Sequence, residues 1–174
     1  MLRLVRFQHI KRNHRLLTTA KTYKERRLVA FSKEDLYSCV ADVSSYSQFV
    51  PWCKESKVIR SHTSGIEAEL VVGFGIVNEK YLSTVELIEN KSVVAVATNT
   101  NILEHLRTEW KFSDSSSGSD KCWVNFQVDF KFKSAFYNQL SEIFFHEVVA
   151  NMIRAFESRC KRLVREKLPQ NKSP

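Results

Sequence analysis

Glycine and proline are scarce in this chain of 174 residues, which has four glycines and three prolines. A collagen-like segment and a low-complexity linker are therefore excluded. No apolar run approaches the ~18 residues that a membrane-spanning helix needs. The four cysteines form no C-x-x-C pair, which argues against a disulfide scaffold and against a zinc ribbon. With 43% hydrophobic and 26% charged residues, the composition is that of one globular domain, with room for a tail.

Acidic residues are absent before Glu25, and the net charge of +8 is unevenly distributed. Residues 1–30 carry nine Lys and Arg against one acid, residues 31–149 carry eleven against sixteen, and residues 150–174 carry seven against two. The chain after residue 30 is therefore neutral overall, and its two ends hold the basic excess. This distribution does not support a nucleic-acid-binding function, which the total charge alone would suggest.

The first 21 residues have the composition of a mitochondrial transit peptide, because arginines alternate with apolar residues and no acid interrupts them. A secretory signal is disfavoured, since the segment has no continuous apolar stretch. The alternative is a disordered basic arm that binds RNA or anionic lipid. A transit peptide would place the mature protein in a reducing compartment, which fits four unpaired cysteines.

The next residues predict a strand followed by a helical segment. Residues 26–31 are rich in strand-forming side chains. Ser32 can cap the first free backbone N–H groups of a helix, and the two acids that follow suit its positive end. Apolar residues then recur at spacings of three and four until Pro51 ends the helical segment.

After Pro51 the apolar residues alternate with polar ones, which is typical of strands that bury one face. The alternation is clearest over residues 124–132. Further strands are expected at 55–62, 66–74, 79–89, 92–98 and 106–112. No segment between them is long enough for a helical crossover, so we expect antiparallel neighbours in a meander.

From about Ser134 the apolar period returns to 3.6, and Pro169 ends the pattern. This predicts one helix of about 33 residues, the only large element available to cover the buried face of the sheet. The sequence therefore predicts an α+β fold, with a curved seven-stranded antiparallel sheet around a long C-terminal helix. The space that one helix leaves would be an apolar cavity, and the alternative is a solid core of aromatic side chains.

Four segments carry a resemblance to a known family. They are Tyr23-x-x-Arg26-Arg27, Tyr46-x-x-Phe49-Val50-Pro51-Trp52-Cys53-Lys54, Gly73-Phe74 followed by Glu79-x-Tyr81, and Phe144-Phe145-x-Glu147-Val148-Val149-x-x-Met152-x-x-Ala155-Phe156-Glu157. With these segments the chain resembles the START/polyketide-cyclase superfamily and, within it, the mitochondrial coenzyme Q-binding proteins. The resemblance covers about residues 22–168 and leaves residues 169–174 as a flexible tail.

The resemblance implies a helix-grip fold with a hydrophobic cavity for ubiquinone, which would be a bound ligand and not a catalytic cofactor. It implies a peripheral protein on the matrix side of the inner mitochondrial membrane that acts as a lipid chaperone or carrier for coenzyme Q. Its partners would be that membrane surface and the coenzyme Q biosynthetic complex, without nucleic acid. A similar bacterial branch is linked to ribosomes, so the alternative is a protein-interaction module.

Motifs of enzymes and metal sites are missing. The sequence has neither G-x-S-x-G nor H-E-x-x-H, and its histidines are scattered singly. Gly73-Phe74-Gly75 lacks the third glycine of a dinucleotide fingerprint and lies at an expected hairpin tip. We therefore expect no catalytic residues, no metal site and no enzyme activity.

Two apolar loops, residues 49–52 and 73–77, are expected to flank the cavity mouth and to enter the bilayer interface, with Trp52 as the anchor. The alternative is burial of these loops against neighbouring elements. The basic last turns of the helix would attract anionic lipid or complement the helix dipole. The expected ligand-binding residues are Val50, Pro51, Trp52, Leu70, Val72, Phe74, Trp110, Phe126, Val128, Phe130, Phe145, Val149, Met152 and Phe156.

Overall fold

A single antiparallel sheet dominates the computed structural model, which describes residues 20–74, 77–116, 118, 120–134, 137 and 150–167. Its strand order is β1-β7-β6-β5-β4-β3-β2. The strands are β1 (Lys21–Val29), β2 (Cys53–His62), β3 (Gly65–Phe74), β4 (Val77–Ile88), β5 (Ser92–Thr98), β6 (Leu103–Asp114) and β7 (Cys122–Phe132). Strands β2 to β7 form the predicted meander, and β1 pairs with β7. The predicted fold class is confirmed.

Strand β1 begins at Lys21 and ends at Val29, whereas the sequence predicted residues 26–31. Its side chains alternate between half-buried and exposed positions along the whole strand. The alternation was not visible in the sequence, because the inward side chains of Tyr23, Glu25 and Arg27 are polar. They bond to one another, since the Tyr23 hydroxyl and the Arg27 guanidinium both donate to the carboxylate of Glu25.

Helix α1 (Lys33–Ala41) starts at the predicted cap, since the Asp35 amide donates to Ser32 Oγ at 3.1 Å. A 3₁₀ helix, η1 (Val43–Gln48), follows it directly. Leu36 and Val40 are buried, as the predicted apolar face requires. The two helices therefore form the covering segment between β1 and β2 that the sequence predicted.

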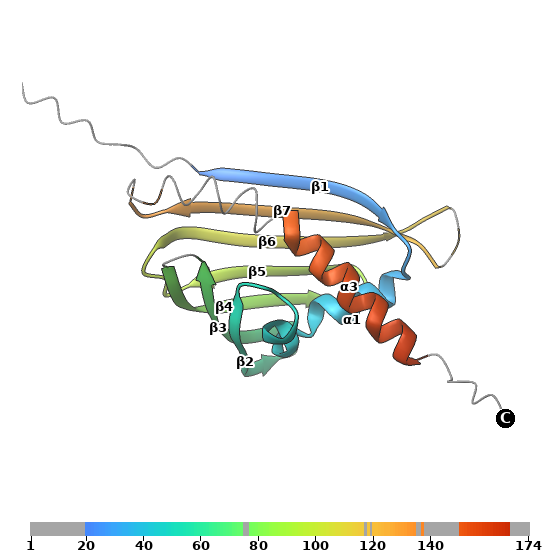
Figure 1. The fold of residues 1–174 in the computed structure, drawn as a ribbon, viewed down its shortest axis with the longest axis horizontal. Helices are drawn as coiled ribbons and strands as arrows, with labels where there is room; N and C mark the ends of the chain where they lie inside the picture. Colours follow the sequence, from blue (N-terminus) through green and yellow to red (C-terminus); the bar gives the residue numbers. More distant parts are fainter. Residues whose placement is uncertain are drawn as a thin grey trace, which may run out of the picture.

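Helix α3 (Ala150–Lys167) crosses the same face of the sheet as α1 (Figure 1). Ile153, Phe156 and Cys160 are its buried side chains. An ion pair of 2.7 Å joins Lys167 at its end to Asp35 of α1. Most of the predicted first half of this long helix lies outside the described residues. No helix in the described part of the chain is long and apolar enough to cross a membrane.

The core lies between the sheet and the two helices, and β7 contributes most to it. Its inward side chains are buried at every second position from Cys122 to Phe132. The cysteines at positions 39, 53, 122 and 160 are all free and buried, and burial raises the pKa of each thiol above its usual range. These thiols are therefore protonated at neutral pH and inert.

Candidate functional site

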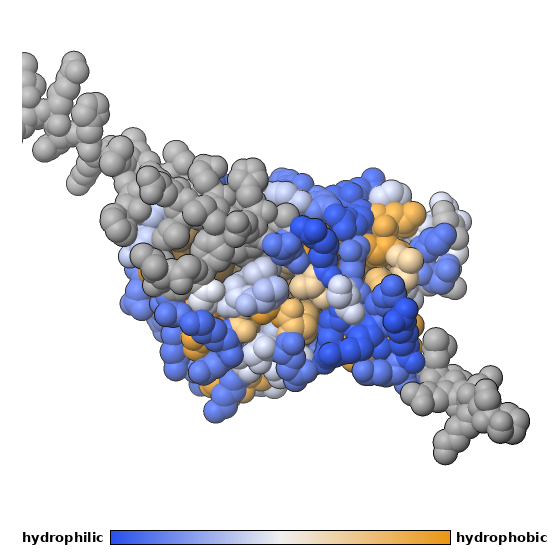
Figure 2. Space-filling view, viewed as in Figure 1, coloured by the Kyte–Doolittle hydropathy of each residue, from blue (hydrophilic) through white to orange (hydrophobic). Residues whose placement is uncertain are grey.

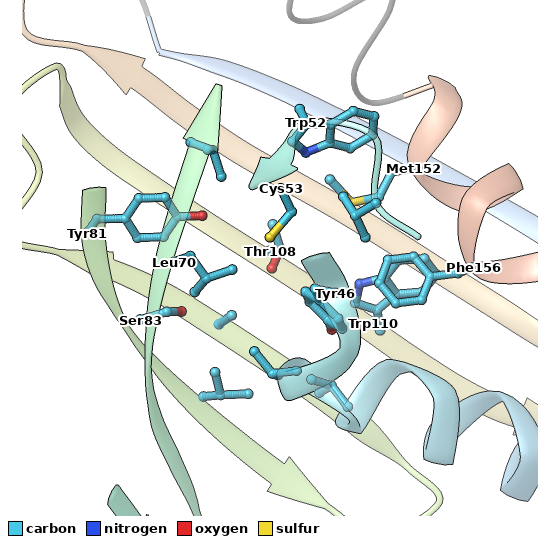
Figure 3. Close-up of a pocket in the computed structure, with 16 residues that line it drawn as sticks. Tyr46, Trp52, Cys53, Leu70, Tyr81, Ser83, Thr108, Trp110, Met152 and Phe156 are labelled. Atoms are coloured by element: carbon cyan, nitrogen blue, oxygen red, sulfur yellow. The ribbon is translucent and has the colours of Figure 1, made fainter. Parts of the chain in front are cut away.

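A cavity of about 90 Å³ lies between the sheet and α3 (Figure 3). Its walls come from η1, the segment after it, strands β2 to β6 and the start of α3. The lining residues are Val43, Tyr46, Val50, Trp52, Cys53, Leu70, Val72, Tyr81, Ser83, Val85, Val93, Ala95, Thr108, Trp110, Met152 and Phe156. None of these lining residues is charged, so the cavity suits an uncharged, largely apolar molecule.

An aromatic cluster around Phe156 closes one side of the cavity. The ring of Phe156 lies 5.0 Å from those of Phe49 and Trp110 and 5.1 Å from that of Tyr46, measured between centroids. Trp110 in turn lies 4.3 Å from Phe126. The space beyond this cluster, towards β7, is therefore filled with side chains.

On the other side of the cluster the strands carry smaller residues. Val93 and Ala95 of β5 and Ser83 and Val85 of β4 face the helix side of the sheet. Phe156 of α3 packs on Trp110. Because the side chains on β4 and β5 are shorter, the layer between helix and sheet is not completely filled beside this pair. The cavity is the space that remains.

The structure places seven of the expected ligand-binding residues at the cavity. They are Val50, Trp52, Leu70, Val72, Trp110, Met152 and Phe156. Phe126, Val128 and Phe130 do not line it, because they lie on β7 behind Trp110, and each is 1% exposed in the packed core. Pro51 is exposed and lies in a surface groove instead. Phe145 and Val149 and the side chain of Phe74 lie outside the described part of the chain.

Sequence reasoning missed the smaller and more polar part of the wall. These residues are Val43, Tyr46, Cys53, Tyr81, Ser83, Val85, Val93, Ala95 and Thr108. A signal was present in the sequence, since Ser83 and Thr108 each lie two residues before a large or branched apolar residue on the same face of the strand, Val85 and Trp110. A hydroxyl on the buried face of a sheet indicates either a local hydrogen bond or a ligand.

Hydrogen bonds within the protein satisfy some of the polar groups at the cavity. The Tyr46 hydroxyl donates to the carbonyl oxygen of Val40 at 2.5 Å, and Cys53 Sγ lies 3.3 Å from the carbonyl oxygen of Glu55. Burial raises the pKa of the Cys53 thiol to about 11, and it also raises the pKa values of Tyr46 and Tyr81. All three side chains are therefore neutral at physiological pH.

The two apolar loops meet at one end of the cavity. The Gly73 amide donates to the carbonyl oxygen of Trp52 at 2.8 Å, which joins the segment after η1 to the end of β3. Val50 is buried and Trp52 is half-buried, so the first loop is only partly available to a membrane. Residues 75 and 76 of the second loop lie outside the described residues.

A surface groove runs between the first loop and α3. It is lined by Phe49, Pro51, Asn151, Arg154, Ala155, Ser158, Arg159 and Arg162. The guanidinium of Arg159 lies over the ring of Phe49, 5.5 Å from its centroid. Figure 2 shows the hydrophilic surface along α3 to which these arginines belong. The groove is basic and adjoins the Trp52 end of the cavity.

The described residues contain no group of three or more His, Cys, Asp or Glu side chains that could hold a metal ion. Ion pairs of Arg27 in β1 with Glu157 and of Asp35 in α1 with Lys167 join these two elements to α3. The cavity is more enclosed than the groove between the first loop and α3.

Comparison with known proteins gives a family. Residues 29–157 match the family described as polyketide cyclase/dehydrase and lipid transport. The chain is 42% identical over 149 residues to the mitochondrial coenzyme Q-binding protein COQ10 homolog B of Xenopus laevis, across 84% of this chain and 61% of that protein. It is 33% identical over 159 residues to the mitochondrial coenzyme Q-binding protein COQ10 of Drosophila melanogaster, across 91% and 63%. The chain thus spans less than two thirds of the length of these relatives.

A bacterial relative carries a different name. The chain is 30% identical over 134 residues to the ribosome association toxin RatA of Escherichia coli strain K12, across 77% of this chain and 83% of that protein.

Solved structures show the same fold at low identity. The Zhui aromatase/cyclase of Streptomyces sp. R1128 matches with a TM-score of 0.72 at 15% identity, across 84% of this chain and 96% of that one. A START superfamily protein from Mycobacterium smegmatis matches with a TM-score of 0.70 at 18% identity, across 82% and 98%. At these identities the similarity shows a START/polyketide-cyclase fold and nothing about chemistry.

Proposed function

The chain belongs to the polyketide cyclase/dehydrase and lipid transport family, and from this we propose that its cavity binds coenzyme Q and that the protein is a carrier or chaperone for this lipid. The observation that carries the proposal is the uncharged cavity between α3 and β2–β6. The names of the relatives from frog and fly support coenzyme Q as the ligand. Those names, together with the basic first 21 residues, support a mitochondrial location.

The volume of the cavity sets a condition on binding. An apolar cavity of about 150 Å³ accommodates benzene. A volume of about 90 Å³ is smaller than that, so a quinone ring must push side chains apart as it enters. The half-buried side chains of Met152 and Trp52 are the ones to move, since methionine is unbranched and adapts its shape readily.

A carrier of a polyisoprenoid lipid also needs a membrane contact. Each CH₂ group moved from lipid into water costs about 0.8 kcal/mol, so a long tail has to pass directly from bilayer to protein. In the proposal the exposed Pro51 and the half-buried Trp52 touch the inner membrane from its matrix side, and the basic groove binds its anionic head groups. The coenzyme Q biosynthetic complex is a further proposed partner on that surface.

The first test is organic extraction and mass spectrometry of the full chain after purification from a quinone-producing host. An equimolar amount of ubiquinone is the expected result. A different lipid would keep the carrier function and change its substrate. A folded protein without any lipid would contradict the proposal.

The membrane contact has a separate test in flotation with phosphatidylcholine vesicles, with and without phosphatidylglycerol. At about 1 kcal/mol per charge, Arg159→Gln with Arg162→Gln should weaken binding to the anionic vesicles roughly 30-fold. Lys161→Gln with Arg165→Gln removes the same charge from the same helix outside the groove. Equal losses in both pairs would show a diffuse basic surface and not a groove that binds head groups.

The similarity to RatA favours a second candidate function, a ribosome-associated interaction module. It predicts salt-sensitive co-sedimentation with ribosomal particles. The excess of acids over bases in residues 31–149 disfavours an RNA-rich partner. We propose no enzyme activity, because the cavity residues include no carboxylate or histidine to act as an acid or base.

A further inference from the structure

We propose that Tyr81, Ser83 and Thr108 bind the head group of the ligand, with their hydroxyls donating to acceptor oxygens on opposite edges of one ring. This inference rests on the proposed function, because it assigns a role to one part of the same cavity. It goes further by assigning the side chains that hold the two carbonyl groups of the quinone ring. It also gives the direction in which the ligand lies.

The three hydroxyls differ from the other polar groups of the fold in their bonding. The Tyr46 hydroxyl at the same cavity donates to a backbone carbonyl, and the buried carboxylate of Glu79 accepts from two backbone amides. Within the described part of the chain, the side chains of Tyr81, Ser83 and Thr108 make no hydrogen bond, although Ser83 is only 5% exposed.

Their oxygens face open space and are not enclosed by protein. No fully enclosed side-chain nitrogen or oxygen among the described residues lacks a partner. The unbonded hydroxyls of these three cavity residues therefore reach the cavity, and Figure 3 shows the Tyr81 and Ser83 oxygens directed into it. Three unbonded hydroxyls that open into one otherwise apolar cavity can each donate a hydrogen bond to a polar group of a ligand.

The register of the sheet sets the spacing of these hydroxyls. Ser83 on β4 lies opposite Ala97 of β5, and Thr108 on β6 lies opposite Ala95 of β5. Two strand spacings and a two-residue offset separate their Cα atoms by a distance on the order of 12 Å. A single acceptor cannot bond to both hydroxyls across that distance, whereas a ring with an acceptor on each edge can. The short side chain of Ala95, which lines the cavity between β4 and β6, leaves room for the ring.

The surroundings of this polar band give the ligand a direction. Val43 and Val93 lie beyond it and are buried, which closes that end of the cavity. Trp52 and Met152 lie at the other end and are half-buried. A head group at the band therefore has its apolar tail directed past Trp52 and Met152, next to the exposed Pro51.

The test compares two probes on the full-length protein. One is a ubiquinone with a ten-carbon saturated tail, and the other is decylbenzene, which has a similar tail and no ring oxygens. Binding is followed by the fluorescence of the cavity tryptophans Trp52 and Trp110. The variants Tyr81→Phe, Ser83→Ala and Thr108→Val each remove a hydroxyl with little change of shape. Each should weaken quinone binding roughly 2- to 12-fold and leave decylbenzene binding unchanged.

Thr84→Val is the matched control, because Thr84 neighbours Ser83 on β4 and is exposed. It should bind both probes as the natural protein does. If the natural protein binds quinone and the three hydroxyl variants bind it equally well, the head-group assignment is overturned and the proposed function stands. If the natural protein binds neither probe, the proposed function itself fails. Thermal melting of each variant identifies losses that come from unfolding.

Discussion

A larger side chain at position 95 should increase stability and remove ligand binding together. Ala95 lines the cavity beside Val93, on the short middle strand of the sheet. Ala95→Ile adds three carbon atoms, which at about 0.8 kcal/mol per buried CH₂ contribute about 2.4 kcal/mol. A second estimate agrees, since a cavity of about 90 Å³ at about 24 cal/mol per Å³ costs about 2 kcal/mol. Isoleucine also suits a strand better than alanine does.

We therefore expect the free energy of unfolding to rise by about 2 kcal/mol, which corresponds to an increase in Tm of roughly 4–8 °C. Urea unfolding measures the first quantity, and lipid extraction from the same preparation measures the bound quinone. Val94→Ile enlarges the neighbouring side chain of β5, which alternation places on the opposite face of the sheet, and should retain the quinone. A variant at position 95 that is more stable and still binds quinone normally would refute the cavity as the ligand site. A destabilised variant would show that the cavity has no room for three carbons.

Three further predictions concern side chains outside the proposed head-group site. Lys167 lowers the pKa of Asp35 by hydrogen bonding, so Asp35→Asn should cost up to about 1 kcal/mol at pH 7. That difference should vanish as the pH falls through the pKa of Asp35 in the folded protein, which lies below 3.8. A cost that is the same in urea unfolding at pH 7 and at pH 3 would contradict this prediction. The carboxylate of Glu79 is 4% exposed and accepts hydrogen bonds from the amides of Asn101 and Ile102. Glu79→Ala should therefore lower the free energy of unfolding by about 3 kcal/mol, and Glu79→Gln by clearly less. Equal losses of the two variants in thermal melts would contradict this. Burial raises the pKa of Cys53 to about 11, so iodoacetamide should alkylate this thiol slowly at pH 8, and more slowly when quinone is bound. Mass spectrometry measures the alkylation rate. A rate equal to that of a free, exposed thiol would contradict the burial of Cys53.

The sequence predicted most of the fold because its periodicities are clear where one face is buried. Strand β7 alternates without interruption, and Ser32 is an unambiguous helix cap. Strand β1 was predicted too short, because its inward Tyr23, Glu25 and Arg27 form a polar cluster that pairs with Glu157 of α3. This cluster depends on a helix that lies more than a hundred residues further along the chain. A pattern in the local sequence therefore cannot predict it.

The candidate site was predicted only in part, for a different physical reason. Periodicity shows which residues face the helix layer, but it does not show where that layer is incompletely filled. The predicted ligand-binding residues included the large aromatic residues Phe126 and Phe130, but these fill the space under the helices. The cavity lies where the inward residues are small or hydroxylated, as at Ser83 and Ala95. The solid core and the cavity, which the sequence left as alternatives, therefore coexist on the two sides of Trp110.

The small volume of the cavity also bears on where a ligand would enter it. Moving Trp52 and Met152 apart exposes apolar surface, and in water this costs about 25 cal/mol per Å². Against the acyl chains of a bilayer the same surface stays out of water, so most of that cost disappears. A protein binds its ligand with lower apparent affinity when the conformation that can bind is rarely populated. Contact with a membrane should therefore raise the apparent affinity for quinone by raising the population of the open cavity. Quinone presented in vesicles that bind the groove should load more readily than quinone presented in vesicles that do not.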